Sequence, residues 1–196
     1  MFTFIPCVAG CGRPAISGSN ICFIHQANQR QETGRLVAQI TENKIIKDLI
    51  AAGVSFDGVD FSQRHLYGCN FREAHFSKCN FSGSLMRMCF FDFADFTDCD
   101  FTKSDLQFMS FGGAKINNCN FEGSELVHIN FLGAAVSKTS FSNSNLYNSR
   151  FINTDLEEVK FVDCNVKRVN FASARQKDVA FKSSNTAEAI FELDEP

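Results

Sequence analysis

The sequence is short of several residue types, and each shortage limits what the chain can be. It has no Trp, two Tyr and three Pro among 196 residues, although it has 23 Phe. No segment approaches the roughly 20 consecutive apolar residues of a membrane-spanning helix, so we expect no membrane partner. The net charge of −3 is small, so on electrostatic grounds we expect no nucleic-acid partner.

Targeting and catalytic patterns are also missing. The opening residues, MFTFIPCVAG, lack the basic start and the long apolar run of a signal peptide, so we expect a cytoplasmic protein with reduced thiols. No Ser or Cys is recognisably paired with His65, His75 or His128, and FGGAK at 111–115 lacks the spacing of a phosphate-binding loop. The sequence therefore predicts a protein that is not an enzyme.

What the sequence has instead is an apolar residue at every fifth position. The series runs from Phe56 to Phe191 and has 28 positions, of which only Gln176 and Thr186 are not apolar. A step of five rotates an α-helix by about 140° and sends successive strand residues to opposite faces, so neither element keeps the series on one side. We infer a chain that turns a corner every five residues and directs each of these central residues toward one axis.

The neighbouring positions support this interpretation. The residue two before each central residue is nearly always small, and the residue between them is Asp or Asn at 13 of the 28 positions. Residues two apart share a face of an extended segment, so the small and central residues point inward and the residue between them points outward. This unit resembles the pentapeptide-repeat family, whose motif is A(D/N)LXX with Leu or Phe at its centre.

The resemblance implies an all-β solenoid, a right-handed parallel β-helix of square cross-section with four pentapeptides in each coil. Residues 54–193 would then form about seven coils, with 194–196 as a tail. Since residue i lies over residue i+20, the phenylalanines should stack in ladders. One ladder comprises Phe101, Phe121, Phe141, Phe161 and Phe181; another comprises Phe111, Phe131, Phe151, Phe171 and Phe191.

The nine cysteines divide into two groups. Six occupy small inward positions, where Cys acts as a small apolar residue, and we expect them to be free thiols: Cys69, Cys79, Cys89, Cys99, Cys119 and Cys164. The other three form the pattern Cys7-x3-Cys11-x10-Cys22-x2-His25. Three thiolates and an imidazole are suited to a structural, tetrahedral Zn²⁺. The stretch also resembles short Cys/His zinc-binding modules, and the alternative is four unrelated residues in a flexible tail.

A helical cap is expected between this module, residues 1–28, and the solenoid. Residues 29–53 have apolar spacing that suits an amphipathic helix from about Arg35 to just before Gly53. Such a helix would cover the open end of the first coil, and binding to a partner is the alternative role. The other end has no equivalent helix, so a second copy of the chain could cover it as a homodimer through the C-terminal coils.

A candidate partner surface lies where apolar residues replace the usual polar ones. It comprises Leu85, Met88, Phe90, Phe93 and Phe108, beside a series of carboxylates formed by Asp92, Asp95, Asp98, Asp100 and Asp105. Exposed apolar groups with a polar rim are typical of interaction sites, although corner side chains can also fold over their neighbours. The sequence therefore predicts a protein-binding scaffold. The alternative is an acidic mimic of DNA that binds DNA gyrase or topoisomerase IV, as some members of the resembled family do.

Overall fold

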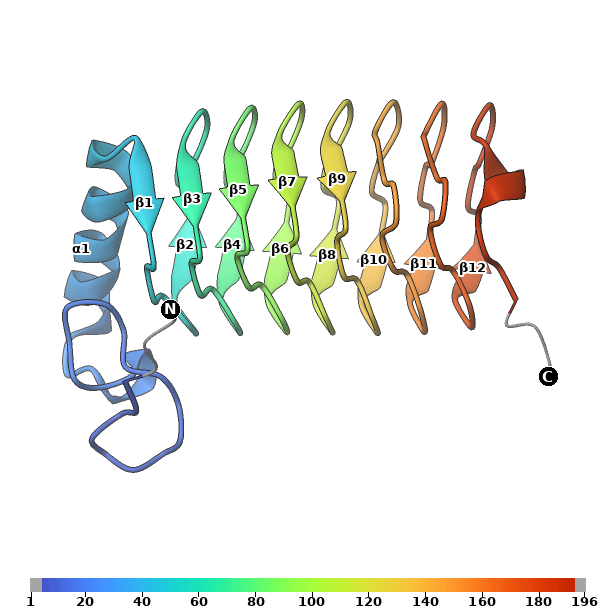
Figure 1. Ribbon diagram of the computed structural model, residues 1–196. Coiled ribbons are helices and arrows are strands. Elements are labelled where there is room, and N and C mark those ends of the chain that lie inside the picture. The colour runs from blue at the N-terminus through green and yellow to red at the C-terminus, as the bar shows by residue number, and fades with distance from the viewer. Residues whose placement is uncertain (1–4, 193–196) are drawn as a thin grey trace.

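The computed structural model describes residues 5–192 as a long solenoid with a helix and a small loop-rich module at its N-terminal end (Figure 1). A short 3-10 helix, η1 (Phe23–His25), and helix α1 (Gln29–Glu42) precede the strands. The strands are β1 (Ile45–Lys47), β2 (Ser55–Asp57), β3 (His65–Tyr67), β4 (His75–Ser77), β5 (Leu85–Arg87), β6 (Asp95–Thr97), β7 (Asp105–Gln107), β8 (Lys115–Asn117), β9 (Glu125–Val127), β10 (Ala135–Ser137), β11 (Asp155–Glu157) and β12 (Arg175–Lys177), followed by η2 (Thr186–Glu188).

The solenoid has four sides, and on each side the chain pairs in parallel with the segment twenty residues further on, as His75 does with Asp95. Side 1 is the sheet β1-β3-β5-β7-β9, and side 3 is the seven-stranded sheet from β2 to β12. Side 2 is the series of bridges that links Ile50, Asn70, Phe90, Ser110, Asn130, Arg150, Asn170 and Ile190. Side 4 is the corresponding series from Asp60 to Ala180. This arrangement confirms the predicted parallel β-solenoid of about seven turns.

Each corner of the solenoid has a residue with left-handed backbone conformation. It lies two positions after each central residue, from Asp48 to Ser183, and 21 of these corner residues are not glycine. At Phe93, for example, φ is 59°, and the N–H of Ala94 donates to the carbonyl of Phe91 at 3.1 Å. This is the geometry of a type II turn, which requires positive φ at its third residue. The repeat therefore turns at every fifth residue.

The predicted phenylalanine ladders fill the interior. The rings of Phe101 and Phe121 stack with centroids 4.4 Å apart, and those of Phe111 and Phe131 are 5.2 Å apart. Burial of each ring contributes about 1.5–3 kcal/mol, and stacking adds about 0.5–1.5 kcal/mol per pair. The core of the solenoid is therefore largely a set of stacked benzyl groups.

The small inward positions support these ladders. The six cysteines of the solenoid are buried and free, as the sequence predicts. The sulfur of Cys79 lies 3.5 Å from the carbonyl oxygen of Phe56, and the hydroxyl of Ser124 donates to the carbonyl of Phe101 at 2.7 Å. Both interactions span 23 residues, so Cys and Ser have the same role at this position.

The helical cap is present, but its bounds differ from the expected ones. Helix α1 begins after Asn28, whose side chain accepts from the N–H of Gln31, and it ends at Glu42 rather than near Gly53. Leu36 and Ile40, one turn apart, are fully buried in the same core cluster as the first coils. The segment that follows belongs to the solenoid, because Ile46 and Ala51 extend the series of central residues backward from Phe56. The predicted boundary at residues 53 and 54 thus falls within the first coil.

The C-terminal end of the solenoid is more open than the N-terminal end. Phe191, the last ring on side 2, is 37% exposed, and Ile190 beside it is 45% exposed. Gln176, which interrupts the apolar series, is also exposed. The predicted tail at 194–196 lies outside the described residues. Among residues 5–192, no helix has the length and apolar character needed to cross a bilayer.

Candidate metal centre and interaction surface

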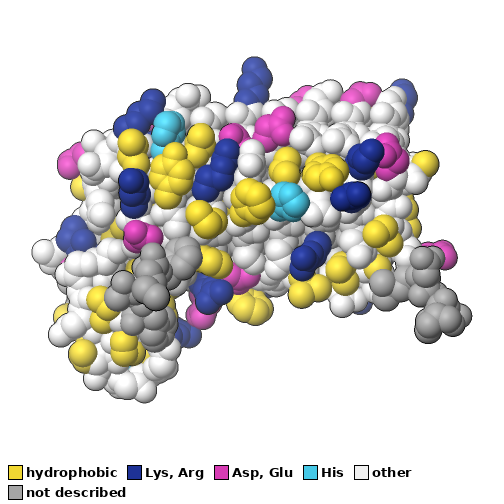
Figure 2. All heavy atoms as spheres, viewed as in Figure 1, with side chains coloured by type: hydrophobic (Ala, Val, Ile, Leu, Met, Phe, Trp, Pro, Cys, Tyr) yellow, Lys and Arg dark blue, Asp and Glu magenta, His cyan; other side chains and the backbone are white. Residues whose placement is uncertain are grey.

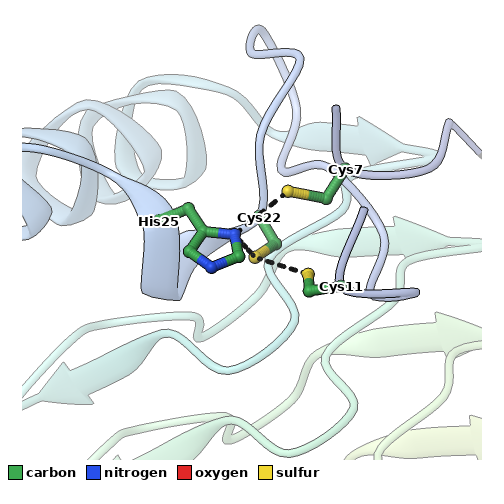
Figure 3. Close-up of side chains that lie close together, drawn as sticks. All are labelled: Cys7, Cys11, Cys22 and His25. Atoms are coloured by element: carbon green, nitrogen blue, oxygen red, sulfur yellow. Dashed lines mark hydrogen bonds between the residues drawn. The ribbon is translucent and has the colours of Figure 1, made fainter. Parts of the chain in front are cut away.

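The module before α1 brings together the three cysteines and the histidine that the sequence singles out. The sulfur atoms of Cys7, Cys11 and Cys22 and a ring nitrogen of His25 all lie within 4.8 Å of one another (Figure 3). A tight loop with Gly10 at φ 74° separates the first two cysteines. Residues 23–25 form η1, so that Cys22 and His25 lie on adjacent turns of backbone.

The distances fit the edges of a coordination tetrahedron. Zn–S bonds of about 2.3 Å and Zn–N bonds of about 2.0 Å give edges of about 3.8 Å between sulfur atoms and about 3.5 Å between sulfur and nitrogen. The sulfur atoms of Cys11 and Cys22 are 3.6 Å apart. The Nδ1 atom of His25 lies 3.3 Å from the sulfur of Cys7 and 3.5 Å from that of Cys22. These residues could therefore hold a tetrahedral metal ion.

The electrostatic surroundings differ between the thiols. The hydrogen bond to His25 lowers the pKa of the Cys7 thiol to about 6, and the backbone N–H of Cys22 contributes in the same direction. Burial raises the pKa of the Cys22 thiol. A bound cation favours the thiolate form of both groups, because a metal ligand must be deprotonated.

The N-terminal module is fixed against the first coils of the solenoid. The N–H of Ser17 donates to the carbonyl of Ile50 at 2.9 Å, and the N–H of Ile50 donates to the hydroxyl of Ser17 at 2.8 Å. Arg13 forms an ion pair with Glu73 at 3.2 Å, and Ile16 is buried in the common core. A hollow of about 450 Å³ remains between the module and side 2, lined by Ile5, Ile16, Ile50, Arg72 and Phe90 among others.

The apolar residues of the predicted partner surface mostly border side 2. Phe90 lies on side 2 itself, Met88 and Phe108 occupy the corner between sides 1 and 2, and Phe93 occupies the corner between sides 2 and 3. Leu85 lies on side 1, in β5. The guanidinium of Arg72 lies 5.1 Å from the centre of the Phe90 ring, and the ring of Phe108 stacks on that of His128 at 5.0 Å.

The structure does not bring the five predicted carboxylates onto one surface. A segment of 14 residues wraps most of the way around a coil, so Asp95, Asp100 and Asp105 lie on sides 3, 4 and 1, while Asp92 and Asp98 lie near two different corners. Most of them are also paired. Asp92 binds Arg72 at 3.1 Å, Asp95 binds His75 at 2.9 Å, Asp98 accepts from Asn118 at 2.7 Å, and Asp105 binds Arg87 at 2.5 Å. They form separate polar contacts rather than one acidic patch.

Further residues of side 2 were not identified from the sequence alone. Leu132 is exposed beside the series, and a hollow of about 300 Å³ is lined by Phe90, Phe108, His128 and Arg150. Figure 2 shows hydrophobic and histidine side chains interspersed with basic ones across one flank of the solenoid. The signal that could have found these residues is the register of twenty, which places 90, 110, 130 and 150 in one row.

The fold and its repeating unit define a class of protein, the four-sided parallel β-solenoid scaffold. The model of the pentapeptide repeat region matches residues 51–131 and 114–191. The chain belongs to the pentapeptide repeat family. Members of this family are generally structural or interaction proteins. No curated protein sequence matches the chain.

Solved structures of pentapeptide repeat proteins resemble the chain. HetL from Nostoc sp. strain PCC 7120, involved in heterocyst differentiation regulation, has 11% identity and a TM-score of 0.34, covering 80% of this chain and 95% of its own. A protein from the thylakoid lumen of Arabidopsis thaliana has 28% identity and a TM-score of 0.38, covering 52% and 68%. A trypsin-treated form of QnrB1, a plasmid-mediated fluoroquinolone resistance protein, has 21% identity and a TM-score of 0.37, covering 76% and 80%. With TM-scores below 0.5, these structures support no functional conclusion.

Proposed function

We propose that this protein is a non-enzymatic binding scaffold whose protein partner docks on side 2 of the solenoid. The proposal rests on one observation, the gathering of exposed large apolar side chains. Among the described residues of the solenoid, these are Ile45, Met88, Phe93, Phe108, Leu132, Ile190 and Phe191. Met88, Phe93, Phe108 and Leu132 lie at or beside the corners of side 2, whereas Ile190 and Phe191 lie at its open C-terminal end. A single side with such a concentration of apolar groups is typical of an interaction surface.

The backbone conformation of three of these residues strengthens the proposal. Met88, Phe93 and Phe108 have φ values of 54°, 59° and 56°, in the left-handed region where Gly, Asn and Asp are favoured. Their side chains are also 53%, 69% and 56% exposed. A large apolar side chain at such a corner is unfavourable both for the backbone and for solvation. Its presence is better explained by binding than by folding.

The test replaces corner residues and measures partner capture and stability together. Phe93→Asn and Phe108→Asn place a residue suited to positive φ at each corner and remove the apolar surface. We expect affinity capture from the native cell to lose the partner, while the thermal midpoint stays nearly the same. Lys78→Asn, at a corner beside side 4 with φ 52°, is the matched control and should retain capture. Capture that survives both Phe substitutions would contradict the proposal.

We also propose that the metal is Zn²⁺ and that its role is structural. Three thiolates and one imidazole are a ligand set that Zn²⁺ prefers, and four protein ligands leave no open position for catalysis. The ion would keep the module folded against side 2, where the module forms one wall of the larger hollow. A reducing location such as the cytoplasm suits the nine free cysteines.

Mimicry of DNA toward gyrase or topoisomerase IV is the alternative function. It requires a continuous anionic surface, and the dispersed, paired carboxylates around Asp95 give it little support. A gyrase supercoiling assay separates the two functions, because the scaffold proposal expects no inhibition at micromolar protein. Inhibition that is lost in an Asp95→Asn, Asp100→Asn variant would favour mimicry.

A further inference from the structure

Side 2 has a basic end as well as an apolar end. Arg150 lines the hollow that also contains Phe90 and Phe108, and Arg168 occupies the corner beside side 2. Within residues 5–192 neither guanidinium forms an ion pair, and both residues are exposed. Between residues 107 and 173, side 2 and its two corners contain no acidic residue, and Glu188, which follows Arg168 in the same corner row, pairs with Lys167 at 2.7 Å.

The spacing of the aromatic and basic groups is regular. Phe90 and Arg150 lie in the same row of side 2, three coils apart, because each coil advances the register by twenty residues. Phe108 and Arg168 lie in the same corner row, again three coils apart. Stacked strands are about 4.8 Å apart, so each aromatic group is about 14 Å from its arginine. An extended chain covers that distance in four to five residues at about 3.3 Å per residue.

The floor between these two ends is polar and contains groups that can hydrogen-bond. The amide of Asn130 donates to the hydroxyl of Ser110 at 3.3 Å, and Asn148 and His128 are hydrogen-bonded at 2.8 Å. His128 also supports the Phe108 ring by parallel stacking. The hollow is therefore a shallow groove along the solenoid axis, apolar at Phe90 and Phe108 and cationic at Arg150.

We propose that side 2 binds an extended peptide segment of a partner protein, in which an apolar side chain is followed four to five residues later by acidic residues. This inference rests on the proposed function and specifies its partner. The apolar side chain would contact Phe90 and Phe108, and the carboxylates would pair with Arg150 and Arg168. Charge complementarity sets the direction of the peptide, from the module toward the C-terminal coils.

A protein segment fits this surface better than a nucleic acid does. Tight binding to a phosphate backbone usually involves several basic side chains, about six to ten for a duplex-binding protein. Over residues 107–173, side 2 and its corners offer the two guanidinium groups of Arg150 and Arg168, which are suited to two carboxylates. The exposed apolar corners at Met88 and Phe93 add contact area for aliphatic or aromatic side chains.

The test uses fluorescein-labelled peptides of defined spacing in a fluorescence polarisation assay. The probe is a ten-residue Gly/Ser peptide with one Leu and, four and five residues later, two Asp residues. One control peptide has Lys in place of both Asp, and another has Leu adjacent to the Asp pair. We expect the probe to bind at least about tenfold more tightly than either control, with binding that weakens as salt is raised.

Protein variants identify the site of binding. Arg150→Glu with Arg168→Glu should reduce probe affinity at least about tenfold and should make the Lys peptide the preferred ligand. Lys160→Glu changes an exposed charge on side 4 and should leave probe binding unchanged. An unfolded variant would bind neither peptide. Binding of the Lys peptide by the Arg150→Glu, Arg168→Glu variant therefore cannot result from lost stability.

Three outcomes would overturn the inference. These are no measurable binding of the probe, equal binding of the Asp and Lys peptides, or tighter binding of a twelve-nucleotide single-stranded oligothymidine that depends on the same arginines. If the native partner is still lost on Phe108→Asn while the charge exchange has no effect, the scaffold proposal stands and only the acidic peptide is wrong. If partner capture is unchanged by every substitution on side 2, both proposals fail.

Discussion

Ser17 and Ile50 exchange two hydrogen bonds, one between backbone groups at 2.9 Å and one through the serine hydroxyl at 2.8 Å. Ser17 belongs to the N-terminal module and Ile50 to the first coil, so this pair joins the two parts of the protein. The module can keep this position only if its short loops are held together. Its four potential ligands are the clearest means of doing so.

Metal removal should therefore destabilise the N-terminal end. We expect purified protein to contain one zinc ion per chain, and a chelator or Cys22→Ser to remove it and lower the thermal midpoint. Metal content by plasma mass spectrometry and melting by circular dichroism are the measurements. Cys119→Ser is the matched control, because Ser occupies equivalent inward positions such as Ser124 without disturbing the coil. Equal melting of the wild type and Cys22→Ser would contradict a stabilising metal.

The nine thiols should react in two classes. Burial raises the pKa of the Cys164 thiol and shields it from reagents, and the other five cysteines of the solenoid are buried as well. With metal bound, we expect a thiol reagent at pH 8 to modify none of the nine. After chelation, Cys7, Cys11 and Cys22 should react, and the remaining six only after unfolding. Early reaction of a solenoid thiol would show that the coils open locally.

Two phenylalanines three positions apart should respond very differently to substitution. Phe111 is fully buried in the ladder of side 2, and Phe111→Ala should cost about 3–5 kcal/mol, because it leaves a cavity between stacked rings. Phe108 is 56% exposed at a left-handed corner, and Phe108→Asn should change stability by less than about 1 kcal/mol. Urea denaturation of both variants measures the difference. Comparable losses would show that Phe108 is part of the core.

The open C-terminal end should be a contact between two copies of the chain. Ile190 and Phe191 are exposed there, and the last coil presents a sheet edge at β12. We expect a concentration-dependent dimer in sedimentation velocity, and Ile190→Asp should shift it toward monomer. Leu132→Asp, which alters an exposed residue of side 2 away from this end, should leave the dimer intact. A monomer at all concentrations would exclude the contact.

The solenoid could be predicted from the sequence because its geometry repeats with the covalent chain. Each central residue, from Phe56 onward, identifies one side. The four potential ligands, Cys7, Cys11, Cys22 and His25, are close in sequence within a short module, and the structure brings them together. The end of the helix could not be located in this way. Residues 45–50 have apolar spacing that suits both a helix and a coil, and pairing of β1 with β3 decides in favour of the coil.

The proposed interaction surface was only partly predictable for a related reason. Residues adjacent in sequence, such as Asp95 and Asp100, are carried to different sides, whereas Phe90 and Arg150 are brought to the same side by the twenty-residue register. Residues that are neighbours on the surface of a solenoid are thus those separated by whole coils of twenty residues, not those close in sequence. The sequence pattern identified the unusual residues, and the register determined which of them lie on the same side of the solenoid.

The constant step of twenty residues also makes the length of this molecule adjustable. Deleting one whole coil, for example 121–140, would join each side to its own continuation and would place Phe141 over Phe101 and Phe151 over Phe111. Duplication of a coil would lengthen the solenoid by one coil in the same way. The protein could therefore change its reach along a partner in units of about 4.8 Å without any redesign of its interior.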